Sequence, residues 1–354
     1  MRLQITILGL LVTCSAYSQT LGGSSVFNFL KLSNTPQLTG LGGVNVSQTS
    51  HDVGMAFYNP ALLDSTMHTQ MNAVFNSFYA DIKTYHLSLG YRNEQLNTNF
   101  LWGLQYFSYG NIQETDASGN ILGSWRPTDW VMQVSASRSY LQKWNYGVAM
   151  KFINSNYGQY RSNGIAADAG ILFHDSVHLF SASVLAKNMG FQLKRYEGAS
   201  AEDLPFDLAA GISKRLEHAP FGFSITAHHL HQFDIRYNDT TFNNDNVLGP
   251  TSNNKKFTFD KFFRHFILAS QIYIGNYIEV SLAYNHLRRQ ELNIDKNGNG
   301  LNGFSVEVGA LFNKIQIHYA RAYYQNNTAY NQFGLNLQLN KYFGLRKFGE
   351  KIGW

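Results

Sequence analysis

Apolar and polar residues alternate along most of this chain, and this feature most constrains what the chain can fold into. Residues 333–340 alternate strictly, with Phe or Leu at every odd position and Gly, Asn or Gln between them. Successive side chains of a β-strand point to opposite faces, so this is a strand with one apolar and one polar face. The same period recurs at 85–92, 146–152, 278–285 and 304–309. The pattern predicts an all-β protein.

Fourteen segments of this kind follow one another from residue 69 to residue 340. They cover 69–80, 83–92, 99–108, 128–138, 144–153, 164–174, 177–188, 206–214, 221–230, 263–273, 277–286, 303–313, 315–324 and 331–340. Most are close to the roughly 9 to 11 residues that a tilted strand needs to cross a bilayer. Bacterial single-chain barrels have an even number of strands, so fourteen fits a closed antiparallel transmembrane β-barrel.

The connections between these segments alternate in length, as they do in outer-membrane barrels. The expected outer connections are 81–82, 109–127, 154–163, 189–205, 231–262, 287–302 and 325–330. The expected periplasmic ones are 93–98, 139–143, 175–176, 215–220, 274–276 and 313–314. All the outer connections except the first are at least as long as the longest inner one. In a soluble β-sandwich, short and long loops are not expected to alternate in this way.

The polar face of the strands carries charged residues, which also bears on the fold. Lys151, Asp168 and Glu279 have the parity of that face. The core of a soluble β-sandwich, the alternative fold, would bury each at a cost on the order of several kcal/mol. We expect a water-filled barrel lumen to solvate them instead. A helical membrane protein is excluded, because the mean hydropathy is −0.25 and no apolar run after the first residues is long enough to span a bilayer.

The first eighteen residues have the pattern of a secretory signal peptide. Arg2 precedes an apolar run from Ile5 to Val12, and small or polar residues lead to Ser18, after which we expect cleavage. The only cysteine, Cys14, lies in this segment, so the mature chain would have neither disulfides nor thiolate chemistry. A lipoprotein signal is the alternative, although Val12 and Thr13 are bulky for such a site. The formal charge of +5 comes from scattered residues and indicates no nucleic-acid partner.

Two segments flank the predicted barrel. Residues 19–68 contain the possible short strand 41–46, and Asn59-Pro60 predicts a turn into a short helix. We expect this segment on the periplasmic side, where it either plugs the lumen or flanks it. Residues 341–354 form a basic C-terminal tail. With an even number of strands, both termini are expected in the periplasm and the long loops outside the cell.

The N-terminal segment carries a resemblance to a known family. Leu41-Gly42-Gly43 followed by Tyr58-Asn59-Pro60-Ala61 resembles the FadL-type family of fourteen-stranded outer-membrane barrels, which includes long-chain fatty-acid transporters and the secretion protein PorV. Further stretches resemble the PorQ proteins of the type IX secretion system of Bacteroidota. These stretches are Val26 to Leu30, Glu217 to Leu230, Arg264 to Leu268, and Tyr284 to Leu292. Residues 238–256, which are rich in asparagine, match nothing in that pattern.

The resemblance implies a non-enzymatic role. The PorQ proteins that the chain resembles are membrane anchors in an attachment complex with PorU, PorV and PorZ, in which they hold the surface protein PorZ. The family has no catalytic residues to carry over. The alternative function is a FadL-like outer-membrane channel for hydrophobic compounds. The lumen distinguishes the anchor function from the channel function. A polar, blocked interior favours the anchor, whereas an apolar pocket that reaches a lateral opening favours transport. A membrane-embedded hydrolase lacks a distinctive constellation.

Several motifs suggest sites, and for each a structural interpretation is preferred. His228 and His229 are adjacent on a predicted strand, so they should point to opposite faces and, even with His231, form no metal site without a bulge. Asp295, Asn297 and Asn299 match the start of an EF-hand loop, but Val306 stands where the final glutamate should be. Whether they bind calcium stays open. The glycines of 40–43 lack the third glycine of a dinucleotide fingerprint. We therefore expect no catalytic, cofactor or metal residues.

Aromatic residues and loop length give the remaining expectations. Girdles at the membrane surfaces are expected from Tyr91, Tyr106, Trp130, Trp144, Tyr146 and Tyr284. Arg321 has the parity of the lipid-facing residues and should lie near the outer interface or beyond a bulge. The longest connection, 231–262, is the expected docking site for a surface partner; the alternative is that its flanks extend the two strands above the membrane as a packed hairpin. Its aromatic and apolar flanks are Phe233, Ile235, Tyr237, Phe257, Phe259 and Phe262.

Overall fold

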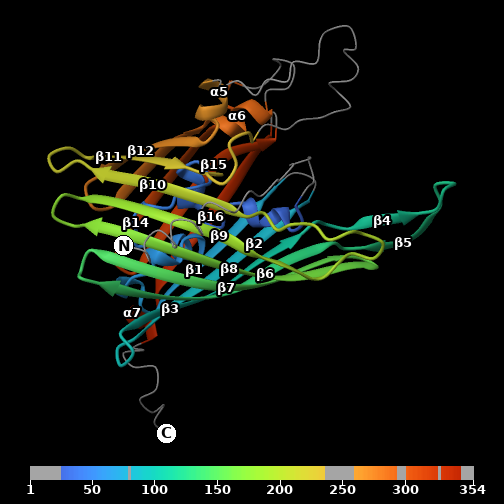
Figure 1. Cartoon of the computed structure of the whole chain (residues 1–354), viewed down its shortest axis with the longest axis horizontal. Helices are drawn as coiled ribbons and strands as arrows, with labels where there is room; N and C mark the ends of the chain where they lie inside the picture. The colour runs from blue at the N-terminus through green and yellow to red at the C-terminus, as the bar shows by residue number, and fades with distance from the viewer. Residues whose placement is uncertain (1–24, 79–80, 236–258, 293–299, 326–327, 344–354) are drawn as a thin grey trace, which may run out of the picture.

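The chain folds into a closed antiparallel β-barrel of fourteen strands, seen from the side in Figure 1. This computed structural model describes residues 25–78, 81–235, 259–292, 300–325 and 328–343. The barrel closes where the first strand pairs with the last, with Ala73 opposite Leu335 and Phe75 opposite Phe333. Closure leaves no strand edge unpaired, which is the condition for a sheet to span a membrane.

The fourteen barrel strands agree with the predicted segments to within a few residues. They are β1 (Gln70–Ser77), β2 (Lys83–Asn93), β3 (Thr98–Ser108), β6 (Thr128–Tyr140), β7 (Trp144–Tyr157), β8 (Tyr160–Asp175), β9 (Phe180–Lys194), β10 (Asp207–Arg215), β11 (Phe221–Ala227), β12 (Phe266–Ile274), β13 (Ile278–Asn285), β14 (Phe304–Leu311), β15 (Ile315–Gln325) and β16 (Thr328–Gln338). The prediction of a fourteen-stranded barrel is confirmed.

The two ends of the barrel differ, as the loop lengths predicted. We call the end with the turns 94–97, 141–143, 176–179, 216–220, 275–277 and 312–314 the short-turn end, and the opposite end the long-connection end. Two expected outer connections are wrong. β7 and β8 extend as a hairpin to Tyr157 and Tyr160, so 154–163 is mostly strand. β15 and β16 likewise pair as far as Gln325 and Thr328, so 325–330 is mostly strand. The connection 109–127 holds a hairpin that was not predicted, β4 (Ile112–Thr115) with β5 (Ile121–Trp125). It projects beyond the barrel in Figure 1.

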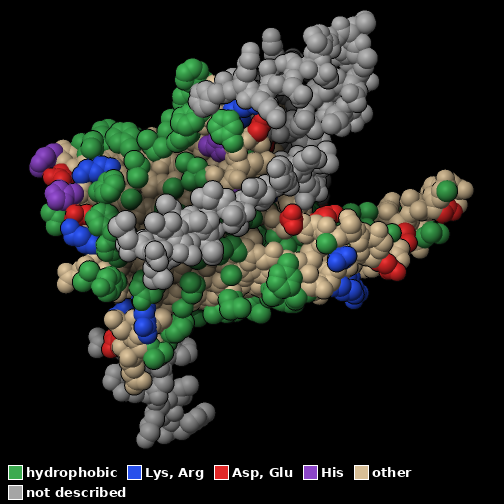
Figure 2. Space-filling model, viewed as in Figure 1, with side chains coloured by type: hydrophobic (Ala, Val, Ile, Leu, Met, Phe, Trp, Pro, Cys, Tyr) green, Lys and Arg blue, Asp and Glu red, His purple; other side chains and the backbone are tan. Residues whose placement is uncertain are grey.

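The outer face of the barrel is apolar. Phe75, Leu87, Val148, Ile171 and Phe333 are exposed there, and hydrophobic side chains cover much of the wall in Figure 2, with charged ones gathered toward the ends. The expected girdle residues have the outward parity and lie near strand ends. Arg321 is also exposed, in the half of β15 nearer the long-connection end, with its guanidinium 6.0 Å from the ring of Tyr323.

Residues 25–69 fill the lumen as a plug of short helices. These are η1 (Asn28–Lys31), α2 (Pro36–Gly40), α3 (Val53–Tyr58), η2 (Pro60–Leu62) and η3 (Ser65–Met67). Their starts follow from the sequence: Asp52 accepts a hydrogen bond from the Gly54 amide at 2.8 Å, and Asn59 accepts one from the Ala61 amide at 3.0 Å. Pro60 is the first residue of η2, so the turn predicted at Asn59-Pro60 is confirmed.

The plug fits the wall through apolar and polar contacts together. Its side chains Leu38, Leu41, Val53 and Met55 are completely buried. Wall glycines let its backbone approach closely: a Cβ on Gly147 would lie 2.3 Å from the carbonyl of Pro60. The lumen is therefore filled with protein, and the expectation of a water-filled interior is wrong for its central part.

The plug begins at the long-connection end. Ser25 bridges to Asp203 in the connection between β9 and β10, whereas the helix α7 (Leu339–Phe343) follows β16 at the short-turn end. The two ends of the described chain thus lie at opposite ends of the barrel, and the plug crosses the lumen instead of entering from the side of α7. The predicted signal peptide, 1–18, and most of the predicted tail, 341–354, lie outside the described residues. Within the described residues no helix is long and apolar enough to cross a membrane.

Candidate functional sites at the two ends of the lumen

The plug leaves a pocket at the long-connection end, and half of its lining residues are aromatic. Its volume is about 510 Å³. The plug contributes Phe27 and Phe29, and the wall and its loops contribute Tyr109, Tyr157, Tyr160 and Tyr196. The polar residues Ser25, Asn28, Asp129, Ser155 and Glu202 also line the pocket, and a volume of this size is typical of sites for small organic ligands.

Asp129 of β6 organises the wall side of this pocket. Its carboxylate accepts hydrogen bonds from the hydroxyls of Tyr109 at 2.6 Å and Tyr157 at 2.8 Å, and from Ser155. Asp129 is only 2% exposed, so the three donors replace the water that a buried carboxylate would lose. The two tyrosine rings are thereby held 5.9 Å apart, and Tyr196 stands 6.0 Å from Tyr157.

The plug side of the pocket is fixed by the first described residues. The Val26 amide donates to the Asp203 carbonyl at 3.0 Å, and Phe27 adopts a left-handed conformation with φ 57°. The Phe29 ring packs edge-on against Phe107 at 5.2 Å. Burial raises the pKa of Tyr196 to about 12, so this loop tyrosine stays a neutral hydrogen-bond donor. The pocket combines aromatic rings with polar groups, among them the carboxylates of Asp129 and Glu202.

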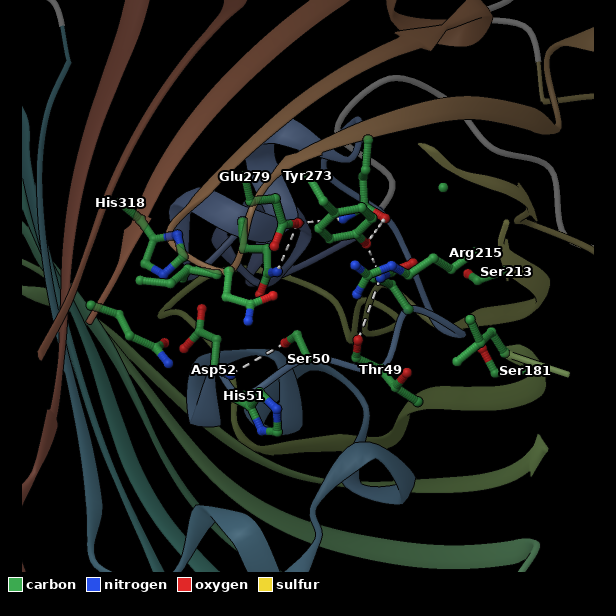
Figure 3. Close-up of a pocket in the computed structure, with 18 of the residues that line it drawn as sticks. Thr49, Ser50, His51, Asp52, Ser181, Ser213, Arg215, Tyr273, Glu279 and His318 are labelled. Carbon is green, nitrogen blue, oxygen red and sulfur yellow. Dashed lines mark hydrogen bonds between the residues drawn. The ribbon is translucent and has the colours of Figure 1, made fainter. Parts of the chain in front are cut away.

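A second cavity, the inner vestibule, opens at the short-turn end and is polar. Its volume is about 390 Å³. In Figure 3 the plug loop from Thr49 to Asp52 faces the wall side chains Arg215, Tyr273 and Glu279. The Arg215 guanidinium lies 4.0 Å from the centre of the Tyr273 ring, and the Tyr273 hydroxyl donates to Gln271 at 3.1 Å. The vestibule can admit water and small polar solutes as far as the plug.

Between the two cavities, buried charges are paired. Lys151 Nζ lies 2.6 Å from Asp168 Oδ2 and 2.8 Å from Asn188 Oδ1. Lys187 Nζ lies 3.5 Å above the ring of Tyr58 in the plug. The prediction that Lys151, Asp168 and Glu279 face the lumen is confirmed, since all three are inward and buried. Partner groups of the wall and plug stabilise these charges in place of bulk water.

One buried group of acid, histidine and serine could suggest a hydrolase. Glu307 accepts from Ser281 Oγ at 2.9 Å and lies 2.9 Å from His318 Nδ1. A nucleophile needs its base within hydrogen-bond reach, whereas here both the serine and the histidine contact the acid. The group is buried beneath Gly40 of the plug, whose Cβ would meet the Glu307 side chain. It serves the contact between plug and wall.

The three histidines near β11 lie differently from the prediction. The strand ends at Ala227, so His228 and His229 are beyond it and the alternation of strand faces does not apply. His229 has φ 54°, and the Nδ1 atoms of His228 and His229 face each other at 2.5 Å. The ring of His231 lies 6.0 Å from that of His229. Burial lowers the pKa of His229 below its ordinary value.

The remaining candidate motifs are placed as follows. Asp295, Asn297 and Asn299 lie outside the described residues. Gly42 and Gly43 have φ of 92° and 86° in the turn after α2, which gives the glycine cluster a structural role in the plug. Of the expected docking flanks, Phe233, Phe259 and Phe262 are exposed, while Tyr237 and Phe257 are not described. Sequence reasoning missed the aromatic pocket, because its residues are scattered from Phe27 to Tyr196.

The fold and its two cavities define a class: a plugged fourteen-stranded barrel with the architecture of outer-membrane proteins. No family model and no curated protein matches the chain. Among solved structures it is similar to a TodX monoaromatic hydrocarbon channel mutant (TM-score 0.49, 10% identity, 85% of this chain and 97% of that one). It is also similar to a Pseudomonas aeruginosa FadL homologue (0.43, 9%, 86% and 97%) and to the KdgM porin (0.31, 7%, 76% and 98%). At this level the likeness is one of fold.

Proposed function

We propose that this protein is an outer-membrane barrel that takes up small hydrophobic, preferably aromatic, compounds at its long-connection end. The observation that supports this proposal is the aromatic pocket between plug and wall. Outer-membrane barrels have their longer loops outside the cell, so we place this pocket at the extracellular mouth. Some barrels of similar fold are named as monoaromatic hydrocarbon channels, but the proposal depends on the pocket.

The pocket is suited to such ligands because its ring faces are already in place. A compound entering it would contact Phe27 and Phe29 on one side and Tyr157 and Tyr196 on the other. Each ring contact in a desolvated pocket contributes about 0.5 to 1.5 kcal/mol beyond area burial. The Asp129 carboxylate is already satisfied by three hydroxyls, so it does not oppose an apolar ligand.

Passage would require the plug to move, since it fills the central lumen. The pocket couples binding to that movement because two of its rings, Phe27 and Phe29, belong to the plug. A ligand that separates these rings from the tyrosines of the wall loosens the outer end of the plug. The inner vestibule then gives an exit at the short-turn end.

A removable cross-link between plug and wall tests this proposal. Ser47 Oγ of the plug lies 2.8 Å from Ser213 Oγ of β10, so Ser47→Cys with Ser213→Cys places two thiols within bonding reach. We expect the oxidised double variant in proteoliposomes to lose uptake of 1-N-phenylnaphthylamine, and a reductant to restore it. The two single variants are controls. Unchanged uptake by the oxidised protein would show that the compound does not pass the plug.

A second variant tests the pocket itself. Removing one ring by Phe27→Ala should weaken binding of the same probe by up to about tenfold, since a lost aromatic contact is worth about 0.5 to 1.5 kcal/mol. Phe75→Ala removes an exposed ring from the outer face of the barrel and serves as the matched control. If both variants bind the probe equally well, the probe binds outside this pocket.

A second candidate function is the membrane anchor of a type IX attachment complex, holding a PorZ-like surface protein beside PorU and PorV. Two observations favour it: the lumen is polar and blocked, and apolar side chains are exposed on elements that extend past the long-connection end. The hairpin β4–β5 exposes Ile121 and Leu122, and α5 (Phe259–Phe263) exposes Phe259 and Phe263. Exposed apolar clusters of this kind are typical of protein interfaces.

Co-purification from detergent-solubilised outer membranes tests the anchor. We expect Phe259→Ser with Phe263→Ser to reach the membrane folded and to lose its surface partner, while the Ser47→Cys, Ser213→Cys cross-link leaves the partner bound. Retention of the partner by the phenylalanine variant would exclude α5 as the docking element. The cross-link thus separates the two candidates, because only transport needs a mobile plug.

A further inference from the structure

Three side chains of metal-ligand type meet at the long-connection end, away from both cavities. Asp207 is the first residue of β10, and His228 and His229 follow the last residue of β11. The Nδ1 atoms of the two histidines are 2.5 Å apart, and His229 Nδ1 is 4.0 Å from Asp207 Oδ1. All three ligand atoms lie within 4.8 Å of one another.

The local backbone explains why neighbouring histidines converge. The His228 amide still donates to the His265 carbonyl at 2.9 Å, and the His265 ring donates back to the His228 carbonyl at 2.8 Å, so the β11–β12 pairing holds His228 in place. His229 then turns into the left-handed region with φ 54°. Its amide donates to Asp207 Oδ1 at 2.7 Å. This turn brings the His229 ring back onto that of its neighbour.

Two ring nitrogens this close share either a proton, as an N–H···N hydrogen bond, or a cation. Each neutral imidazole has one N–H and one lone pair. His228 is 2% exposed, and its Nε2 has no hydrogen-bond partner among the described residues. With either tautomer, Nε2 of His228 keeps no partner among the described residues, so what points to a cation is the convergence of both Nδ1 atoms with Asp207. A cation held at the Nδ1 atoms would use the lone pairs that now face each other.

We infer that Asp207, His228 and His229 bind a divalent transition metal, with Zn²⁺ as the best match. Two imidazoles and a carboxylate are a common donor set for zinc, whereas calcium and magnesium prefer oxygen ligands. Tetrahedral zinc with bonds of about 2.0 to 2.1 Å separates its ligands by about 3.3 Å. The histidine nitrogens therefore need to part by less than about 1 Å. The site is reachable, since the side chains of His229 and Asp207 are 28% and 14% exposed.

Cationic groups lie near the site, among them Arg288 and Lys31, and the carboxylate of Asp207 is the negative group that offsets them. Lys187 is opposite Asp207 in the β9–β10 ladder, but its ammonium group lies over the Tyr58 ring at 3.5 Å. A bound ion would join the start of β10 to the end of β11, at the base of the long connection 228–265. The metal would thus fix the rim of the barrel where its largest outer connection begins.

Zinc titration of the tag-free protein in detergent tests the inference. By calorimetry we expect one Zn²⁺ per chain, and an affinity at least about tenfold lower in His229→Ala and in Asp207→Asn, since even loss of an outer partner of a ligand costs about 10- to 100-fold. His218→Ala, in the exposed turn at the short-turn end, is the matched control and should bind as the unaltered protein does. His228 is left intact because it is buried.

Cobalt provides a second readout that does not depend on affinity. Co²⁺ at this site should give the visible absorption bands of four-coordinate cobalt, and both ligand variants should lose them while still migrating as folded barrels in unheated gels. Equal zinc affinity in all four proteins would mean adventitious ions only and would overturn the site. So would the absence of zinc binding by the unaltered protein, which would leave a shared proton as the species between the rings.

Discussion

At the residue scale, one strand face contacts lipid and the other contacts the plug. In β16 the side chain of Leu335 points outward, while Asn336 is 1% exposed and bonded to Asn72 of β1 at 2.7 Å. The sequence predicted this parity correctly. In the water-filled lumen that the sequence predicted, an arginine at position 336 would have only a mild effect. The plug removes that space, so the expected result changes.

We therefore expect both Leu335→Arg and Asn336→Arg to destabilise the barrel, for different reasons. A charge on the lipid face costs about 2 to 4 kcal/mol near mid-membrane. An arginine at 336 buries a charge and breaks the bond to Asn72, which costs about as much. Urea unfolding in lipid vesicles measures both, with Leu335→Ala and Asn336→Ala as controls. A mild effect of Asn336→Arg would mean that the plug is not seated there.

At the scale of elements, the plug and the wall are matched by small residues. Gly147 of β7 lies against the backbone of Pro60 and Ala61, and a Cβ added there would be 2.3 Å from Pro60. Backbone atoms on both sides cannot rotate away as a side chain can. Polar bonds complete the fit, such as Gln133 Nε2 to the Phe57 carbonyl at 2.9 Å and Thr39 Oγ1 to Gln332 at 2.6 Å.

Gly147→Leu should therefore displace the plug while leaving the barrel closed. Overpacking of this kind costs about 1 to 3 kcal/mol. We expect this cost to weaken the contacts between plug and wall, because β7 pairs with β6 and β8 through backbone hydrogen bonds that the new side chain does not change. Planar-bilayer recordings should show ion-conducting openings that the unaltered protein lacks. Gly123→Ala in the projecting hairpin, where the nearest atom is 3.9 Å away, should conduct no more than the unaltered protein. If the Gly147→Leu protein shows no such openings, the plug accommodates the larger side chain without leaving the lumen.

At the scale of the whole molecule, closure of the sheet dominates stability. Each barrel strand pairs with two neighbours, and β1 pairs with β16 in full register from Gln70 to Ser77. Opening the barrel would expose two strand edges to lipid, where an unpaired backbone group costs several kcal/mol. Unfolding should therefore be cooperative and slow.

This closure predicts heat-modifiable migration. The unheated protein in SDS should run at a different apparent size from the boiled protein, because the closed barrel binds less detergent and stays compact. Disrupting closure with Phe75→Pro in β1, which removes a ladder hydrogen bond, should abolish the difference. A proline in the hairpin β4–β5, Leu122→Pro, should leave the difference in migration unchanged. Identical migration of the unaltered protein before and after heating would contradict a closed barrel.

The sequence by itself determined the strands, their parity and the sorting of short and long connections. These depend on local rules: side chains alternate along a strand, and a bilayer sets strand length. The tertiary structure alone decided what fills the lumen, where the aromatic pocket lies and how His228 and His229 meet. Phe27, Tyr109, Tyr157 and Tyr196 form a pocket only when the barrel closes around the plug. The histidines converge because β11 ends at Ala227, directly before them, and the backbone turns left-handed at His229, which no alternation pattern records.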